Sequence, residues 1–266
     1  MKTVVITGST RGIGCGLADS FLDMDCAVTV SGRSSDAVDR AVVNLSANHE
    51  PARVFGCPCD VTDFQQVQAL WDRSSQHYGK VDIWINNAGI SGPRRCLWEQ
   101  NQQDIDAVIR TNLVGTMFGS KVAVNGMLDQ GFGAIYVMEG AGSDGRRMVE
   151  GMSVYGTSKY GLRYFYESLV EETRHTSLIV GSLSPGMVLT EFLTGQEHEH
   201  PEDWEANKRI FNILADRVET VTPWLAERVL ANEHTGVSIR WLTRAKAMGR
   251  FLRSPFTKRD IFADPK

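Results

Sequence analysis

The sequence predicts an α/β fold, in which a doubly wound parallel sheet is flanked by helices on both faces. Continuous apolar runs rich in β-branched residues recur along the chain, and amphipathic helical stretches lie between them. The first four runs begin roughly 25 residues apart, which is typical of strand–helix–strand units. The expected strands are 3–7, 27–31, 53–57, 81–86, 134–138 and 177–183.

The region that follows residue 190 is richer in helical patterns. Apolar residues recur at helical spacing after Trp204, and a short strand is expected over 236–242. We expect a single domain over 1–266, with a helical substrate lid over 190–232 and a C-terminal helical extension over 243–266. The extension contains a basic amphipathic segment. We favour packing of its apolar side on the domain. Contact with an anionic membrane surface is the alternative.

Composition and charge exclude several classes of protein. A net charge of -4 gives no basic signal, so no nucleic-acid partner is expected. Cys57 and Cys59 could form half a metal site, but no cluster of ligands accompanies them, and we favour buried free thiols. No metal is expected, and five unpatterned cysteines favour a reducing compartment.

Location is predicted from what the chain lacks. The first ten residues begin a strand directly, without the apolar core of a signal peptide. No run of 18 apolar residues occurs, so no membrane span is expected. We expect a cytoplasmic protein, or one at the plastid stroma or thylakoid surface if a leader has been removed.

A glycine-rich stretch, TGSTRGIG, spans residues 7–14 between the first strand and the first helix. Glycine permits a tight turn and a close approach of a pyrophosphate to the N–H groups of the helix N-terminus. This context predicts a Rossmann-type dinucleotide site. The expected contacts in this stretch are Gly8, Thr10, Arg11, Gly12, Ile13 and Gly14.

The end of the second strand indicates which dinucleotide binds. An NAD site commonly has an acidic residue there for the ribose 2′-hydroxyl, whereas this chain has Ser31, Gly32 and Arg33. Arg33 can pair with a 2′-phosphate, and Arg11 is placed to help. The predicted cofactor is therefore NADPH/NADP+. The alternative is that these arginines are ordinary surface charges.

Tyr155 and Lys159 stand four residues apart in a predicted helix, so their side chains share one face. Such a pair is either ordinary surface chemistry or a proton-transfer pair. The residues alone leave both interpretations open.

Six motifs in order resemble the short-chain dehydrogenase/reductase family over residues 2 to about 190. They are TGSTRGIG at 7–14, CDV at 59–61, NNAG at 86–89, Asn112, YGTSK at 155–159 and SPGMVLT at 184–190. The resemblance implies an oxidoreductase acting on a C=O/CH–OH group, commonly a homo-oligomer. It also implies cofactor contacts at Asp60, Val61, Asn87, Ala88, Gly89, Tyr155, Lys159, Pro185, Gly186, Val188 and Thr190.

The resemblance further implies the catalytic roles. Tyr155 would give a proton to the carbonyl oxygen, and Lys159 would lower the pKa of Tyr155 and hold the nicotinamide ribose. Asn112 would anchor a water that leads to Lys159. The family's usual pair of serines at the end of the fifth strand is replaced by Glu-Gly, so we assign the substrate-orienting hydroxyl to Ser143. The alternative is that Ser143 only caps a turn.

The stretches MEGAGSDG, YGTSKYGLR and SPGMVLTEFLT, and the region 208–230, are similar to the chlorophyll b reductases of this family. This implies NADPH-dependent reduction of the 7-formyl group of chlorophyll b or chlorophyllide b to hydroxymethyl. A chlorophyll-type tetrapyrrole would be the substrate, with peripheral membrane contact as a further prediction. The expected substrate contacts are Ser143, Met148, Phe192 and Phe211. The alternatives are a reductase of another bulky ketone or aldehyde and a catalytically silent dinucleotide- or pigment-binding protein.

Overall fold

The computed structural model describes residues 1–146, 148–190, 201–257 and 259–263. Its centre is a seven-stranded sheet in the order β3-β2-β1-β4-β5-β6-β9, in which every pair is parallel. The strands are β1 (Thr3–Ile6), β2 (Ala27–Gly32), β3 (Val54–Pro58), β4 (Ile83–Asn86), β5 (Gly133–Met138), β6 (Leu178–Ser184) and β9 (Ser238–Arg240). The predicted doubly wound sheet is confirmed.

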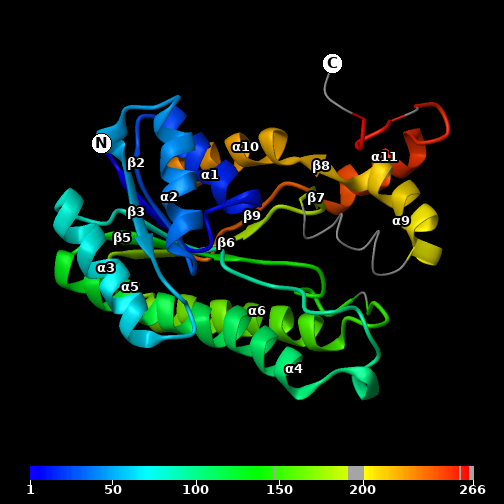
Figure 1. The fold of residues 1–266 in the computed structure, drawn as a ribbon, viewed down its shortest axis with the longest axis horizontal. Helices are drawn as coiled ribbons and strands as arrows, with labels where there is room; N and C mark the ends of the chain where they lie inside the picture. Colours follow the sequence, from blue (N-terminus) through cyan, green and yellow to red (C-terminus); the bar gives the residue numbers. More distant parts are fainter. Residues whose placement is uncertain (147, 191–200, 258, 264–266) are drawn as a thin grey trace.

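Helices cover both faces of this sheet, as Figure 1 shows. One layer contains α1 (Gly12–Asp23), α2 (Ser35–Ser46) and α10 (Val218–Ala231). The other contains α3 (Phe64–Tyr78), α4 (Gln102–Ile109), α5 (Gly115–Gln130) and α6 (Ser153–Thr173), with a π-helical segment (Arg110–Val114) joining α4 to α5. Two short 3-10 helices lie at Pro51–Arg53 and Leu97–Glu99.

Local chemistry explains where α3 begins and ends. The Asp63 carboxylate accepts hydrogen bonds from the backbone N–H groups of Gln65 and Gln66 and so starts α3. Gly79 ends α3 in the left-handed conformation, with φ +80. Such capping fixes the positions at which the chain returns to the sheet.

Two hydrophobic cores lie on the two faces of the sheet. One core joins β1 and β2 to α1 and α10, with Phe21 and Leu225 fully buried. The other joins β4 to α3 and α5, where Trp71 and Trp84 pack with ring centroids 6.1 Å apart. The helix α10 lies within the stretch 190–232 that was expected as a lid, but it packs in this core. Its residues Val221, Leu225 and Val229 are buried against α1.

The C-terminal part adds α9 (Pro201–Leu214), a small two-stranded sheet of β7 (Val188–Leu189) and β8 (Asp216–Arg217), and α11 (Arg244–Arg253). These elements lie together at one end of the molecule in Figure 1. No helix in the part of the chain that the structure describes is long and apolar enough to cross a bilayer.

The structure corrects the expectation that α11 packs its apolar side on the domain. Met248 and Leu252 are 63% and 71% exposed, and the helix has no buried residue. Its attachment is polar instead, because Arg250 pairs with the buried Asp216 at 2.8 Å. Membrane contact stays a prediction.

Candidate active site

The glycine-rich loop follows β1, and the strand order reverses between β1 and β4. This is the position at which open parallel sheets bind ligands. Gly8 has φ +63, and a Cβ there would lie 2.8 Å from Ala88 Cα. A Cβ at Gly14 would collide with the Gly8 carbonyl oxygen and lie 2.5 Å from Asn87 Nδ2. Only glycine fits these two positions of the loop.

Asn87 fastens this loop to the end of β4. Its Nδ2 donates to the carbonyl oxygens of Thr7 and Gly8, each at 2.9 Å. The Thr7 hydroxyl in turn accepts the backbone N–H groups of Asn87 and Ala88 at 3.0 and 3.1 Å. The loop conformation is therefore built into the protein, and the N-terminus of α1 opens directly from it.

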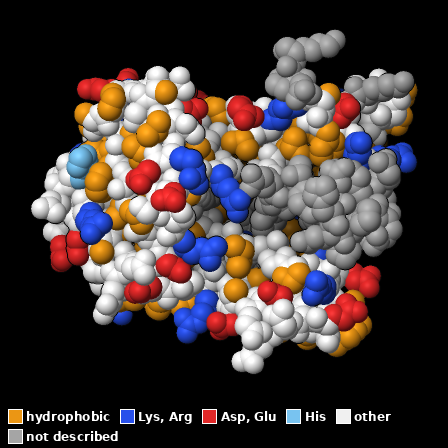
Figure 2. Space-filling view, viewed as in Figure 1, with side chains coloured by type: hydrophobic (Ala, Val, Ile, Leu, Met, Phe, Trp, Pro, Cys, Tyr) orange, Lys and Arg blue, Asp and Glu red, His pale blue; other side chains and the backbone are white. Residues whose placement is uncertain are grey.

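The next strand end brings the predicted phosphate-binding arginine beside the same loop. A Cβ at Gly32 would lie 2.8 Å from Thr10 Cγ2, so the end of β2 touches the glycine-rich loop. Arg33 follows Gly32 and is exposed, and Arg11 is exposed at the start of α1. Figure 2 shows Lys and Arg side chains gathered near the middle of one face of the molecule.

The remaining predicted cofactor residues border this region from other strands. Asp60 and Val61 follow β3, and the Asp60 carboxylate accepts the Thr62 backbone N–H at 2.9 Å. The segment 185–190 follows β6. A Cβ at Gly12 would lie 3.5 Å from Thr190 Cγ2, so this segment reaches the glycine-rich loop. A nicotinamide dinucleotide fits this donor set, since a glycine cradle and a helix N-terminus meet there and Arg11 and Arg33 are adjacent to them in the chain.

Tyr155 and Lys159 lie on the first half of α6 and are both buried, at 7% and 5% exposure. Lys159 Nζ lies 5.9 Å from the centroid of the Tyr155 ring and donates to the Met138 carbonyl oxygen at 3.1 Å. This excludes the interpretation of the pair as surface chemistry. A buried phenol and a buried amine share one face at the end of β5.

The pKa expectation for Tyr155 is wrong in this structure. Burial raises the pKa of the phenol above its ordinary value of 10.0. Burial also lowers the pKa of Lys159 to about 8, and this is opposed by the negative charge of Glu139. Burial is thus the largest cause of the pKa shift for both groups.

Asn112 is fully buried in the π-helical segment and holds the neighbouring loop. Its Oδ1 accepts the Ile90 backbone N–H at 2.8 Å, and its Nδ2 donates to the Ile90 carbonyl oxygen and to Ser158 Oγ, each at 2.9 Å. Ser158 donates to the Tyr155 carbonyl oxygen at 2.7 Å. Asn112 is thus linked to the backbone that carries Tyr155.

Gly140 and Ser143 explain the unusual sequence after β5. A Cβ at Gly140 would collide with the Tyr155 hydroxyl, so a serine at this position would not fit beside the phenol as it is placed here. Ser143 is 4% exposed, and its Oγ accepts the Gly140 backbone N–H at 3.0 Å. The turn therefore brings the Ser143 hydroxyl to the residue that faces Tyr155. The same hydrogen bond stabilises the turn, so both predicted roles are compatible with it.

The three predicted substrate contacts other than Ser143 differ in their surroundings. Met148 is 82% exposed in the loop before α6. Phe192 lies outside the described residues. Phe211 is 6% exposed and packs with Ala215 and Met187, so the structure gives it a packing role rather than an open surface. The helical spacing of Phe211 in α9 therefore reflects packing in this small core.

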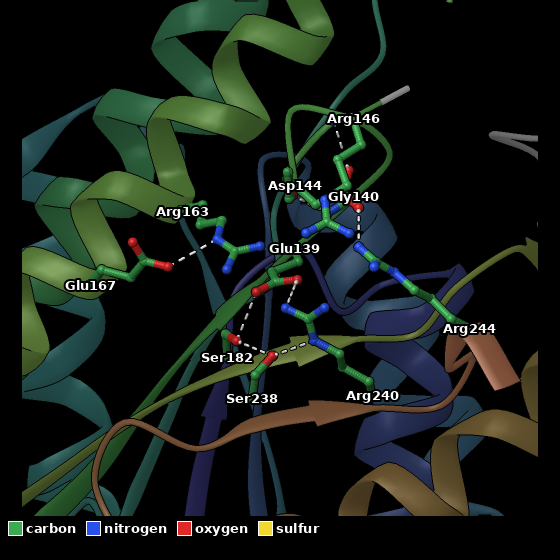
Figure 3. A network of polar contacts seen from close by, with 11 residues as sticks. Glu139, Gly140, Asp144, Arg146, Arg163, Glu167, Ser182, Ser238, Arg240 and Arg244 are labelled. Atoms are coloured by element: carbon green, nitrogen blue, oxygen red, sulfur yellow. Dashed lines mark hydrogen bonds and ion pairs between the residues drawn. The ribbon is translucent and has the colours of Figure 1, made fainter. Parts of the chain in front are cut away.

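Glu139, which directly precedes Gly140, is a further residue of this region that no sequence motif marks. Figure 3 shows its carboxylate among Ser182, Ser238 and Arg240, at the ends of β6 and β9. The sequence does contain an indication of a special role, because an acidic residue stands where an apolar strand ends and where the family commonly has a serine. Only the structure shows that this carboxylate is buried, at 8% exposure.

Comparison with known proteins supports the family resemblance. The family described as short chain dehydrogenase matches residues 2–201. A crystal structure of an actinorhodin polyketide ketoreductase variant with NADPH is similar in fold, with a TM-score of 0.80 and 25% sequence identity. The similarity covers 90% of this chain and 95% of that one.

Similarity to named proteins extends through most of the chain. The probable chlorophyll(ide) b reductase NYC1, chloroplastic, of Arabidopsis thaliana is 36% identical over 91% of this chain and 51% of that protein. The chlorophyll(ide) b reductase NOL, chloroplastic, of the same plant is 35% identical over 92% of this chain and 71% of that protein. This chain thus spans about half the length of the NYC1 protein. The chain belongs to the short-chain dehydrogenase/reductase family, a family of oxidoreductases that bind a nicotinamide dinucleotide.

Proposed function

We propose that this protein is an NADPH-dependent carbonyl reductase that converts the 7-formyl group of chlorophyll b or chlorophyllide b to hydroxymethyl. The observation that carries the substrate is the similarity to proteins named chlorophyll(ide) b reductases, which spans 91% of this chain and so extends past residue 201, where the match to the family ends. A plastid location is part of the proposal, since those relatives are named chloroplastic.

The buried pair on α6 supports reduction as the chemistry. Because burial raises the pKa of Tyr155, the phenol keeps its proton near neutral pH and can donate it to a carbonyl oxygen. Lys159, as an ammonium ion, would stabilise the phenolate that this transfer leaves. Ser143 would hold the carbonyl oxygen by a hydrogen bond. When bound, the nicotinamide supplies the hydride.

The choice of NADPH rests on the charge beside the glycine-rich loop. Arg33 follows the strand end that touches Thr10, and no acidic side chain occupies the position directly after β2. A guanidinium forms charge-assisted hydrogen bonds with a phosphate, whereas a ribose hydroxyl gains much less from it. The 2′-phosphate is the feature that separates the two cofactors.

Arg33→Asp is therefore expected to weaken NADPH binding by about 10- to 100-fold, which corresponds to one charged hydrogen bond lost. NADH binding should change little. Fluorescence titration of both cofactors measures the two dissociation constants, and Arg40→Asp on the exposed side of α2 is the matched control. An equal loss for both cofactors would contradict the 2′-phosphate assignment.

The substrate is tested by incubating the protein and NADPH with detergent-solubilised chlorophyll b and chlorophyllide b. A panel of steroid, quinone and acyl carbonyls runs beside them. We expect loss of the formyl pigment's absorption and formation of the 7-hydroxymethyl product. Turnover of another carbonyl alone would replace chlorophyll b with that substrate class. Cofactor binding without turnover of any carbonyl would favour a silent binding protein.

A further inference from the structure

The buried carboxylate of Glu139 lies at the end of β5 and is held from two neighbouring strands (Figure 3). Ser182 Oγ donates to Glu139 Oε1 at 2.9 Å, and Arg240 Nη2 lies 3.6 Å from Glu139 Oε2. Ser238 Oγ is 2.9 Å from Ser182 Oγ and accepts from Arg240 Nε at the same distance. The carboxylate is therefore fixed in place by β6 and β9.

Its neighbours in the chain both touch the Lys159 side chain. The Met138 carbonyl oxygen accepts from Lys159 Nζ at 3.1 Å. A Cβ at Gly140 would lie 3.1 Å from Lys159 Cε and would collide with the Tyr155 hydroxyl. Glu139 thus stands between the two residues that contact the catalytic pair.

Other charged and titratable groups lie around Glu139. Arg163 and Tyr166 of α6 and Arg240 of β9 line a cavity of about 220 Å³ with Glu139. Arg163 is paired with Glu167 at 2.9 Å, further along α6. Among the described residues, Glu139 is the charge that acts against burial to raise the pKa of Lys159.

We propose that Glu139 is a positioning residue that acts through Lys159: its fixed negative charge keeps the buried amine in the ammonium form. Lys159 is 5% exposed, so burial favours the neutral amine and a nearby negative charge opposes that effect. The carboxylate supplies that charge without occupying the space beside the Tyr155 hydroxyl, which the glycine at 140 leaves open.

The consequence for the reaction rests on the proposed function. The developing phenolate is stabilised only while Lys159 is charged, so reduction should decline as pH rises through the titration of the Tyr155–Lys159 pair. Glu139 would move this decline to higher pH. A protein without the carboxylate would lose reductase activity at a lower pH than the wild type.

The test is a pH titration of Lys159 in the protein without substrate or cofactor. Lysine is labelled with ¹³C at Cε, and the Lys159 signal is assigned by its absence in Lys159→Met. The wild-type midpoint is expected near pH 8. Glu139→Gln keeps the acceptor for Ser182 but removes the charge, and should lower the midpoint by about one pH unit.

Two further variants make the outcome decisive. Glu167→Gln removes a carboxylate on the same helix that pairs with Arg163, and its Lys159 midpoint should match the wild type. If Glu139→Gln does not fold, the double variant Glu139→Gln/Arg240→Gln leaves no unpaired charge and is compared with Arg240→Gln alone, so that only the charge at residue 139 differs. A midpoint equal to that of the matched reference, wild type for Glu139→Gln or Arg240→Gln for the double variant, would overturn the proposal.

A kinetic measurement separates this inference from the proposed function. With any carbonyl substrate that turns over, the alkaline limb of the reduction profile should move to lower pH in Glu139→Gln and return towards wild type in Glu139→Asp. A uniform loss of rate with an unmoved limb would indicate a purely structural role and would contradict the proposal. The titration in the substrate-free protein stands even if the substrate assignment fails.

Discussion

Replacing Tyr155 with phenylalanine is expected to reduce carbonyl reduction by about 10²- to 10⁴-fold, the range attributed to a positioned proton donor. The change removes one oxygen atom and keeps the ring in its buried place on α6. Burial raises the pKa of this phenol, so near neutral pH it carries the proton that the alkoxide needs. No comparable donor replaces it in the variant.

The affinity for NADPH should change little in Tyr155→Phe, because the glycine-rich loop and Arg33 lie on other elements. Steady-state rates and fluorescence titration of NADPH measure the two properties separately. Tyr160→Phe is the matched control, since Tyr160 lies on the same helix and is 57% exposed. Wild-type turnover by Tyr155→Phe would show that the proton comes from another group.

The second large effect is expected on stability, from Asp216→Ala. Asp216 is 2% exposed and accepts hydrogen bonds from Trp241, Arg250 and Arg259 at 2.6, 3.1 and 2.5 Å. Its removal leaves two arginines without their shared partner at the junction of β8 and α11. Breaking a buried ion pair costs about 3 kcal/mol or more, and we expect a loss of that size in the free energy of unfolding.

Chemical denaturation followed by circular dichroism measures this loss. Asp129→Ala, at an exposed position on α5, is the control and should change the free energy by less than about 0.5 kcal/mol. Burial acts to raise the pKa of Asp216, but the hydrogen bonds from Trp241, Arg250 and Arg259 outweigh it and lower the pKa. The contribution of Asp216 is therefore present above about pH 4 and is lost as pH falls. Equal stability of Asp216→Ala and the control would contradict a stabilising role for Asp216.

The sheet and the cofactor loop could be predicted from the sequence because both depend on local patterns. Buried parallel strands are continuous apolar runs, and the loop needs glycine where Gly8 and Gly14 approach Ala88 and Asn87. Spacing alone also placed Tyr155 and Lys159 on one helix face. These features follow from which residues stand next to each other in the chain.

The features that the sequence did not predict depend on contacts between distant segments. The pKa of Tyr155 is governed by burial, which a motif does not measure. The orientation of α11 is set by Arg250 and Asp216, residues that are 34 positions apart. The position of the Glu139 carboxylate depends on Ser182 of β6 and Arg240 of β9, which are distant from it in the sequence. Apolar spacing in α9 could not distinguish a substrate contact from the small core around Phe211.

The central claim is that hydride from NADPH and a proton from Tyr155 are added to the 7-formyl group. The most direct measurement uses NADPH deuterated at the transferable position of the nicotinamide, with chlorophyllide b as substrate and mass spectrometry of the product. We predict one deuterium on the carbon of the 7-hydroxymethyl group with the wild type and loss of this product with Tyr155→Phe. Unlabelled product, or recovery of chlorophyllide b unchanged while another carbonyl of the panel is reduced, would contradict the claim.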